Sequence, residues 1–477
     1  MGIIHGRKKL VKDVSANTLQ TVIVQVFGLV IFFFTSRYLP KDNFGEFNWS
    51  MAVGSTAITA LSMGIDLIFV KRVATSNNVL IISGIHFFHT ILVGLLVCFL
   101  TLFINVIIPS FKANHALFLY IFICLAINNI ANSFKLCLTG LEAYKYLAIL
   151  AFFSNALKLI GVLFLYFFAH FSLPELVLVY IIAAICELIL GYYLLNISLA
   201  SVLKPIVQIN TYKQLISESL PQLGVVLFDS ALARIDWILL GLLSTPLATA
   251  EYSFTYRVFE LSKLPILVLA PILLTRFSKL FANNSELSLN QTQDINQYFR
   301  IELFLVMIIP ITFICLWSPL IDYFTNGKYG LVNETTYLIL AICVPIHAII
   351  NFLWTLAFVN GFLKRIMWIT IIASLVNIVA NFVLISMLAA KGAAVAFLLS
   401  TLVQLILYVF YAKKANFKVN FSNCLLVFTN ALVAVFLGKL ATQNVIICFM
   451  ITMSAYLLMT FFTKQVELKK MRLLLFS

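Results

Sequence analysis

The chain has 477 residues, of which 62% are hydrophobic and only 10% are charged, and its mean hydropathy is +1.05. An ordinary soluble domain is about one quarter charged, and no water-exposed surface covers so much apolar material. The composition excludes a soluble protein and predicts one that folds in a lipid bilayer. The formal net charge of +14 does not indicate a nucleic-acid partner, because the basic residues stand at the ends of apolar runs.

Apolar runs follow one another along the whole chain, and each is near the ~20 residues that a helix needs to cross a bilayer. They lie at residues 17–36, 46–69, 80–108, 116–139, 146–169, 174–198, 217–243, 252–275, 298–320, 334–360, 366–388, 392–412, 421–438 and 444–463. Runs of this length exclude transmembrane strands of alternating polarity. The sequence predicts an all-α polytopic membrane protein with about fourteen transmembrane helices.

The distribution of Lys and Arg gives the orientation in the membrane. With the N-terminus placed in the cytosol, the predicted inside segments carry 22 of the 32 basic residues and the outside segments carry six. Cytosolic loops of membrane proteins carry such an excess of basic residues. Both termini are therefore predicted to be cytosolic.

A weak internal repeat divides the chain into halves. Residues 43–47 (NFGEF) follow the first run, and residues 249–252 (TAEY) follow the seventh, about 205 residues later. Six helices per repeat leave both halves in the same orientation, related by an axis along the membrane normal. The predicted parts are an N-terminal lobe (1–198), a cytosolic linker (199–216), a C-terminal lobe (217–414) and two extra helices with a basic tail (415–477).

Charged side chains inside the spans are informative, because a charge at the bilayer centre costs ~2.5–3.5 kcal/mol and needs a partner or a wet cavity. In the seventh and eighth spans they include Asp229, Arg234, Asp236, Arg257, Glu260 and Lys263. Counted from the outer turn between these two spans, Asp236 lies at the same depth as Arg257. In the same way Arg234 is level with Glu260, and Asp229 is level with Lys263. Two interpretations stay open: a ladder of ion pairs that holds the hairpin together, or a cavity wall whose cations meet an anionic head group.

Further acidic or basic residues lie in other spans. Lys158 and Glu187 lie near mid-depth on the fifth and sixth spans, where a structural ion pair is one interpretation. Glu302 lies in the inner turn of the ninth span and is expected to reach the cytosolic interface.

Two histidines, His86 and His89, stand three residues apart at the start of the third span. They could share a metal ion, but no acidic or cysteine ligand is near them in the sequence. Polar residues at the membrane interface are the favoured interpretation, and Asp66 is expected at the interface as well.

Uncharged polar residues recur at helical spacing within two spans. Gln25 lies one turn after Thr21 on the first span, and Asn128 lies one turn before Asn132 on the fourth. Such stripes mark helix faces turned away from lipid. They either form hydrogen bonds between helices or line a path for a sugar.

Motifs around the first and seventh spans resemble those of a known family. The run Arg37-Tyr38-Leu39-Pro40 and then Phe44-Gly45-Glu46-Phe47 follow the first span, while Glu251-Tyr252 and Tyr256-Arg257-Val258 open the eighth. In order and spacing they resemble the bacterial polysaccharide/O-antigen flippases of the multidrug/oligosaccharidyl-lipid/polysaccharide superfamily. The similarity covers nearly the whole chain.

The resemblance implies a two-lobed helical transporter of the bacterial cytoplasmic membrane that works by alternating access. The implied cargo is an undecaprenyl-pyrophosphate-linked oligosaccharide, with membrane lipids as neighbours and a glycan polymerase and chain-length machinery as further candidate partners. No cofactor is expected, and the absence of an ATP-binding loop argues against ATP hydrolysis by this chain. Drug exporters of the superfamily often carry an acidic residue in the first helix, and residues 17–36 contain none.

Candidate site residues follow from these expectations. Those expected to meet phosphates are Arg37, Lys158, Arg257 and Lys263, and those expected to meet sugar hydroxyls are Gln25, Asn128 and Asn132. Those expected to form the charge ladder or to couple transport to an ion are Glu187, Asp229, Arg234, Asp236 and Glu260. The alternatives are a cation-coupled multidrug exporter of the same fold, a flippase for a peptidoglycan precursor and, with less support from the short outer loops, a membrane glycan polymerase.

Overall fold

The computed structural model of the chain describes residues 24–76, 78–107, 117–282, 289–415, 417, 419–463 and 465. Nearly all of these residues are helical, and no strand occurs among them. Eight of the described helices are long and apolar enough to cross a membrane, or ten spans if two bent pairs each count as one. The all-α polytopic fold is confirmed, while the count of about fourteen spans stays a prediction.

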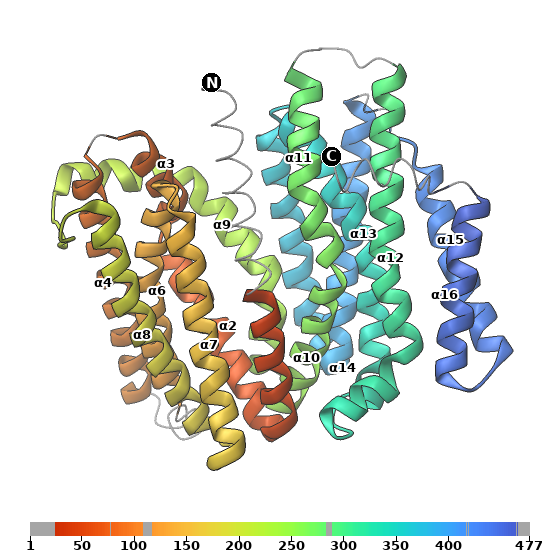
Figure 1. Ribbon diagram of the computed structural model, residues 1–477, viewed down its shortest axis with the longest axis horizontal. Helices are drawn as coiled ribbons and strands as arrows, with labels where there is room; N and C mark the ends of the chain where they lie inside the picture. Colours follow the sequence, from red (N-terminus) through yellow and green to blue (C-terminus); the bar gives the residue numbers. More distant parts are fainter. Residues whose placement is uncertain are drawn as a thin grey trace. The chain divides into compact units, whose positions relative to one another are not determined.

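The chain folds into two compact units, Met1–Ile238 (unit one) and Leu239–Ser477 (unit two). The helices of unit one are Val24–Tyr38, α2 (Lys41–Leu61), α3 (Ile65–Thr75), α4 (Val79–Ile107), α6 (Phe118–Gly140), α7 (Tyr144–Phe168), α8 (Leu173–Leu199) and α9 (Ile209–Leu243), which runs past the division. Helix α6 packs against α2, α3, α4 and α8, and Figure 1 shows α4, α6, α7 and α8 as neighbours. Its buried side chains, such as Phe134 and Leu138, meet Leu150 of α7 and Leu195 of α8 in an apolar core.

Unit two is organised around α13. Its helices are α10 (Pro246–Ser262), α11 (Leu264–Ala282), α12 (Leu289–Thr325), α13 (Gly330–Val359), α14 (Leu363–Lys414), α15 (Ser422–Ala441) and α16 (Val445–Phe462). Helix α13 packs against α10, α11, α12 and α14, whereas α15 and α16 pair with each other and contact α12. The stacked rings of Trp317 and Tyr337, 4.1 Å apart, join α12 to α13 in the core.

Helix α14 combines the two predicted spans 366–388 and 392–412. Its backbone leaves the helical region at Ala389 (φ 48°, ψ −124°), which lies between the two spans. Gly392 follows the break, and a Cβ atom there would lie 2.0 Å from the carbonyl oxygen of Leu384. The missing side chain of Gly392 therefore allows the chain to turn sharply between the two apolar runs.

The second predicted span of each half is bent. Helices α2 and α3 meet at 55°, with positive φ angles at Met63 and Gly64. Helices α10 and α11 meet at 44°, with Lys263 between them. The two bends lie about 200 residues apart in the sequence, close to the spacing of the internal repeat.

Candidate functional site

A buried carboxylate lies where α6, α7 and α8 of unit one converge. Glu187 of α8 is 5% exposed. Its Oε1 accepts a hydrogen bond from Nζ of Lys135 on α6 at 2.8 Å, and its Oε2 accepts one from the hydroxyl of Ser154 on α7. A charge within an apolar protein requires this kind of pairing and hydrogen bonding.

The partner of Glu187 corrects the pairing with Lys158 that depth suggested. Lys158 follows Ser154 by one turn of α7, and its ammonium lies 5.8 Å from the ring centroid of Tyr180 on α8. Within the described parts of the chain, Lys135 is the lysine that forms the ion pair with Glu187. Depth fixes the level of a residue but not the side of the helix on which it lies, and α6 turns Lys135 toward α8. Two lysines against one glutamate leave one positive charge in this cluster.

The two predicted asparagines continue the cluster along α6. Asn128, Asn132 and Lys135 lie at positions i, i+4 and i+7, which places them on one face of the helix. Both asparagines are partly exposed, and Nδ2 of Asn128 lies 3.6 Å from Sγ of Cys124. The structure therefore brings Lys135, Glu187, Lys158 and this asparagine stripe into one polar region of unit one.

Gln25 and Arg37 are twelve residues apart on the described helix Val24–Tyr38, which separates them by about 18 Å at 1.5 Å per residue. The ring of Tyr38, beside Arg37, contacts the ring of Tyr166 at 4.7 Å. Because Tyr166 lies two turns beyond Lys158 on α7, the end of the first helix packs away from the Lys158 level. Arg37 itself lies with its guanidinium carbon 5.7 Å from the Tyr38 ring.

The charged residues of α9 have different surroundings. Asp229 is exposed, whereas Asp236 is 1% exposed. The guanidinium carbon of Arg234 lies 4.6 Å from the ring centroid of Trp237, a cation–π contact on the same helix.

Two charged residues near the end of α10 are in contact. Nη1 of Arg257 lies 2.7 Å from Oε2 of Glu260, so these two residues form an ion pair within one helix. Matching depths across two spans did not predict this contact. Lys263 follows the last residue of α10, and its ammonium lies 4.5 Å from the ring of Phe259.

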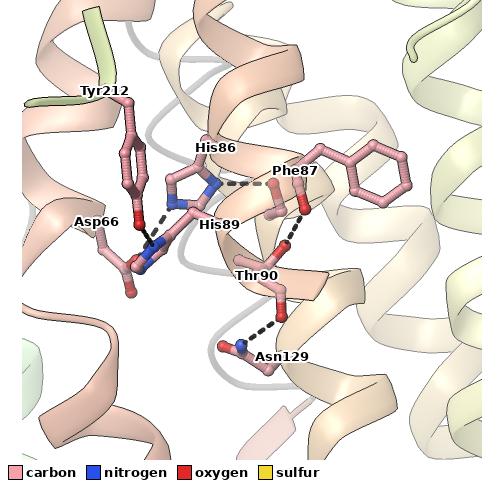
Figure 2. A network of polar contacts seen from close by, with 8 residues as sticks. Asp66, His86, Phe87, His89, Thr90, Asn129 and Tyr212 are labelled. Carbon is pink, nitrogen blue, oxygen red and sulfur yellow. Dashed lines mark hydrogen bonds and ion pairs between the residues drawn. The ribbon is translucent and has the colours of Figure 1, made fainter. Parts of the chain in front are cut away.

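Asp66 and His86 belong to a polar network in unit one (Figure 2), in which the side chain of Asp66 is 41% exposed. The ring of His86 is 1% exposed and stacks on Phe69 at 3.9 Å. Its Nδ1 lies 2.7 Å from the hydroxyl of Ser133, and its Nε2 lies 3.3 Å from Oδ1 of Asp66. His86 is buried within the protein because the bend after Gly64 turns the first residues of α3 over α4, and its place at the membrane interface stays a prediction.

The same network joins α9 to the rest of unit one. His89 is 2% exposed, and its Nδ1 lies 3.0 Å from the hydroxyl of Tyr212, near the start of α9 (Figure 2). Burial raises the pKa of Tyr212, so the phenol keeps its proton. Arg72 of α3 binds Glu218 of α9 through Nη2 at 2.6 Å and through Nε at 3.2 Å. Among the described residues, no three His, Cys, Asp or Glu side chains gather as metal ligands.

The bundle of apolar helices with buried charged clusters defines a polytopic membrane protein. The sequence profile of the family described as polysaccharide biosynthesis protein matches residues 10–277, which is more than half of the chain. The chain belongs to this family, which confirms the resemblance found in its motifs. No curated protein sequence matches the chain.

Solved structures share the fold over most of the chain. Lipid II flippase MurJ in an inward closed conformation matches with a TM-score of 0.74 and 14% identity, over 94% of this chain and 98% of that one. An inward-facing multidrug resistance MATE transporter of the MOP superfamily matches with a TM-score of 0.65 and 13% identity, over 84% and 98%. A MOP superfamily transporter from Pyrococcus furiosus matches with a TM-score of 0.57 and 12% identity, over 86% and 95%. At these identities the likeness establishes the fold alone.

Proposed function

We propose that this protein moves an undecaprenyl-pyrophosphate-linked oligosaccharide, such as an O-antigen or capsule repeat unit, from the inner to the outer leaflet of the bacterial cytoplasmic membrane. Membership of the polysaccharide biosynthesis family and the flippase-like fold support a transport role rather than an enzymatic one. A sugar diphosphate cannot cross hydrocarbon unaided, because its polar groups would lose their hydrogen bonds. Side chains of the protein replace those bonds while the lipid tail stays in the bilayer.

The observation that carries this proposal is the charge of the Lys135–Glu187–Lys158 cluster. A lysine within a transmembrane bundle is costly, and such residues mark binding sites or pathways for polar cargo. Within the described chain, Glu187 neutralises Lys135, and Lys158 has an aromatic ring as its neighbour. A diphosphate would supply a close anion for Lys158, because among the described residues Glu187 makes its ion pair with Lys135.

The other candidate residues take supporting roles in this proposal. Asn128 and Asn132 offer amide donors and acceptors to sugar hydroxyls on the same face of α6 as Lys135. Arg37, Arg257 and Lys263 remain candidates for phosphate contacts, and Gln25 remains a candidate for sugar contacts. Alternating access of two lobes to each side of the membrane would complete the transport cycle, with both termini in the cytosol.

The test replaces Lys158 by Gln in a cell that needs the exporter for its surface glycan. The matched control is Lys145→Gln, because Lys145 is an exposed lysine at the start of the same helix. We expect surface glycan to fall at least tenfold with Lys158→Gln and to stay unchanged with Lys145→Gln, at equal protein levels in the membrane. Normal surface glycan with Lys158→Gln would contradict the role of Lys158.

A cation-coupled drug exporter of the same fold is the second candidate, because a MATE transporter shares the architecture. Its weakness is that the described part of the first helix, residues 24–38, contains no acidic residue. Purified protein in liposomes separates the candidates. Movement of a fluorescent lipid-linked oligosaccharide supports the flippase, whereas export of a cationic dye without lipid movement supports the drug exporter. Parallel liposomes with a lipid-linked peptidoglycan precursor test the choice of cargo.

A further inference from the structure

A completely buried carboxyl group lies in unit two, far along the chain from the lysine cluster. Glu302 of α12 is 0% exposed, which corrects the expectation that it reaches the cytosolic interface. Its Oε1 accepts a hydrogen bond from Nδ2 of Asn351 on α13 at 3.2 Å. Its Oε2 is equally buried, and no group in the described parts of the chain lies within hydrogen-bond distance of it. One oxygen of this carboxyl group therefore lacks a protein partner.

Among the described residues, no charged side chain forms an ion pair with Glu302. The amide of Asn351 is the side-chain group that donates a hydrogen bond to its carboxyl group. Helix α12 packs against α10, α11, α13, α15 and α16. Three titratable side chains on these helices have contacts away from Glu302: Arg276 with the Tyr298 hydroxyl, Tyr456 with the Phe304 carbonyl, and the ring of His347 with that of Phe397. A carboxylate without a cation or a full set of donors is strongly disfavoured in such a place. These surroundings favour the neutral carboxylic acid form of Glu302 over the carboxylate.

A role in packing alone does not explain this residue. Glutamine has the same shape without an acidic proton, and leucine would leave no unsatisfied oxygen. Native proteins contain few buried polar atoms without partners, and each requires an explanation. An ionisable residue within a transmembrane bundle marks a functional site, and proton transfer is one of its common uses.

The surroundings of Glu302 allow its two helices to separate. A cavity of about 330 Å³ lies between α12, α13 and α15, and its lining includes Leu303, next to Glu302, and Ile349, two residues before Asn351. Pro345 also lines the cavity, and a proline within a helix removes the hydrogen bond to the carbonyl four residues earlier. Helix α13 is therefore weakened one to two turns before Asn351, on the side where packing is incomplete.

We propose that Glu302 is a proton-binding site that holds a proton in this conformation and releases it to water when α12 and α13 move apart. In the release step the O–H bond of the carboxylic acid breaks, the proton passes to a water molecule, and the carboxylate stays on Glu302. Repacking of the helices requires the carboxylate to take a proton back. The use of this proton to drive cargo movement rests on the proposed function, whereas the proton site itself does not.

The first experiment records infrared spectra of the full-length protein in lipid nanodiscs at neutral pH. The wild-type spectrum minus that of Glu302→Gln is expected to contain the carbonyl band of a protonated carboxylic acid. The same difference for Glu218→Gln, which removes an exposed carboxylate, is expected to lack this band. A Glu302 difference spectrum without the protonated band would overturn the proposal.

The second experiment measures lipid-linked oligosaccharide movement in liposomes at two pH values one unit apart. A single proton changes its bound fraction by up to about tenfold per pH unit, so the wild-type rate is expected to change severalfold, up to that limit. The rate ratio is expected to be about one for Glu302→Gln and close to the wild-type ratio for Glu302→Asp, which keeps the carboxyl group. A wild-type ratio of one, or an unchanged ratio in Glu302→Gln, would overturn the coupling role.

The two experiments separate this inference from the proposed function. If the wild-type protein moves no lipid-linked oligosaccharide, the proposed function fails, while the infrared band still decides whether Glu302 holds a proton. If Glu302→Gln does not reach the membrane, the same band is followed in Asn351→Leu, which removes the amide donor. A shift of the carboxylic acid band in Asn351→Leu is then expected, and an identical spectrum would contradict the site.

Discussion

The hydroxyl of Tyr212 lies 3.0 Å from Nδ1 of His89, and this contact joins the start of α9 to the buried part of α4. The Arg72–Glu218 ion pair makes a second contact, between α9 and α3. A third lies further along α9, where a Cβ atom on Gly64 would lie 3.0 Å from the backbone nitrogen of Leu223. The first part of α9 is thus held against the bend between α2 and α3.

Tyr212→Phe is expected to loosen the start of α9. Loss of the hydroxyl leaves Nδ1 of the buried His89 without its hydrogen-bond partner, which costs about 1–3 kcal/mol. Hydrogen exchange of the backbone amides in residues 209–220 measures this effect, and faster exchange is expected. Tyr193→Phe is the control, because Tyr193 is 62% exposed on α8. Equal exchange in Tyr212→Phe and wild type would show that the contact does not hold α9.

Apolar runs predicted the helices of this fold well, because a bilayer-spanning segment must be long, apolar and helical. The bend at Gly64 was not predicted, since it depends on positive φ angles at two residues and on the approach of α9 from far along the chain. The burial of His86 follows from that bend, so it was missed for the same reason. The position of a residue within an apolar run predicts its depth in the membrane, but it does not predict where a helix bends.

The candidate site shows the same limit. The sequence identified Lys158 and Glu187 as intramembrane charges, and both lie in the polar region of unit one. It did not identify Lys135 as the partner of Glu187, because ion pairing depends on helix rotation and on which helices are neighbours. The spacing of Asn128, Asn132 and Lys135 at i, i+4 and i+7 was the available signal, since it places Lys135 on the same polar face.

The Lys135–Glu187 pair is expected to stabilise unit one only as a pair. Glu187→Gln leaves a lysine without its anion in a largely apolar setting and is expected to destabilise the protein by about 3–5 kcal/mol. The double variant Lys135→Met/Glu187→Gln removes both charges and is expected to recover most of this loss. Denaturant or thermal unfolding of the purified single and double variants measures the coupling. Strictly additive effects would show that the two side chains do not interact.

Asn132→Leu is expected to reduce transport without reducing stability. Asn132 is partly exposed on the polar face of α6, so leucine costs the fold little. Loss of one hydrogen bond of about 1 kcal/mol to a sugar would slow transport about fivefold. Asn129→Leu is the contrasting variant, because Asn129 is buried and donates to the carbonyl of Thr90. Asn129→Leu is expected to lower the melting temperature. A lower melting temperature with normal transport in Asn132→Leu would exclude Asn132 from the cargo path.

Gly392→Ala is expected to disrupt the break within α14. The new Cβ would lie 2.0 Å from the carbonyl oxygen of Leu384, and backbone atoms cannot yield as a flexible side chain would. We expect a loss of stability of at least about 3 kcal/mol, or failure to accumulate in the membrane. Gly224→Ala is the matched control, because a Cβ atom at this α9 position meets nothing within 4 Å. Alanine is favoured over glycine within a helix by about 0.5–1 kcal/mol, so the control is expected to be as stable as wild type or more so. The measurement is the amount of each variant in the membrane and its unfolding temperature. Equal amounts and equal unfolding temperatures for both variants would mean that α14 does not turn sharply at Ala389.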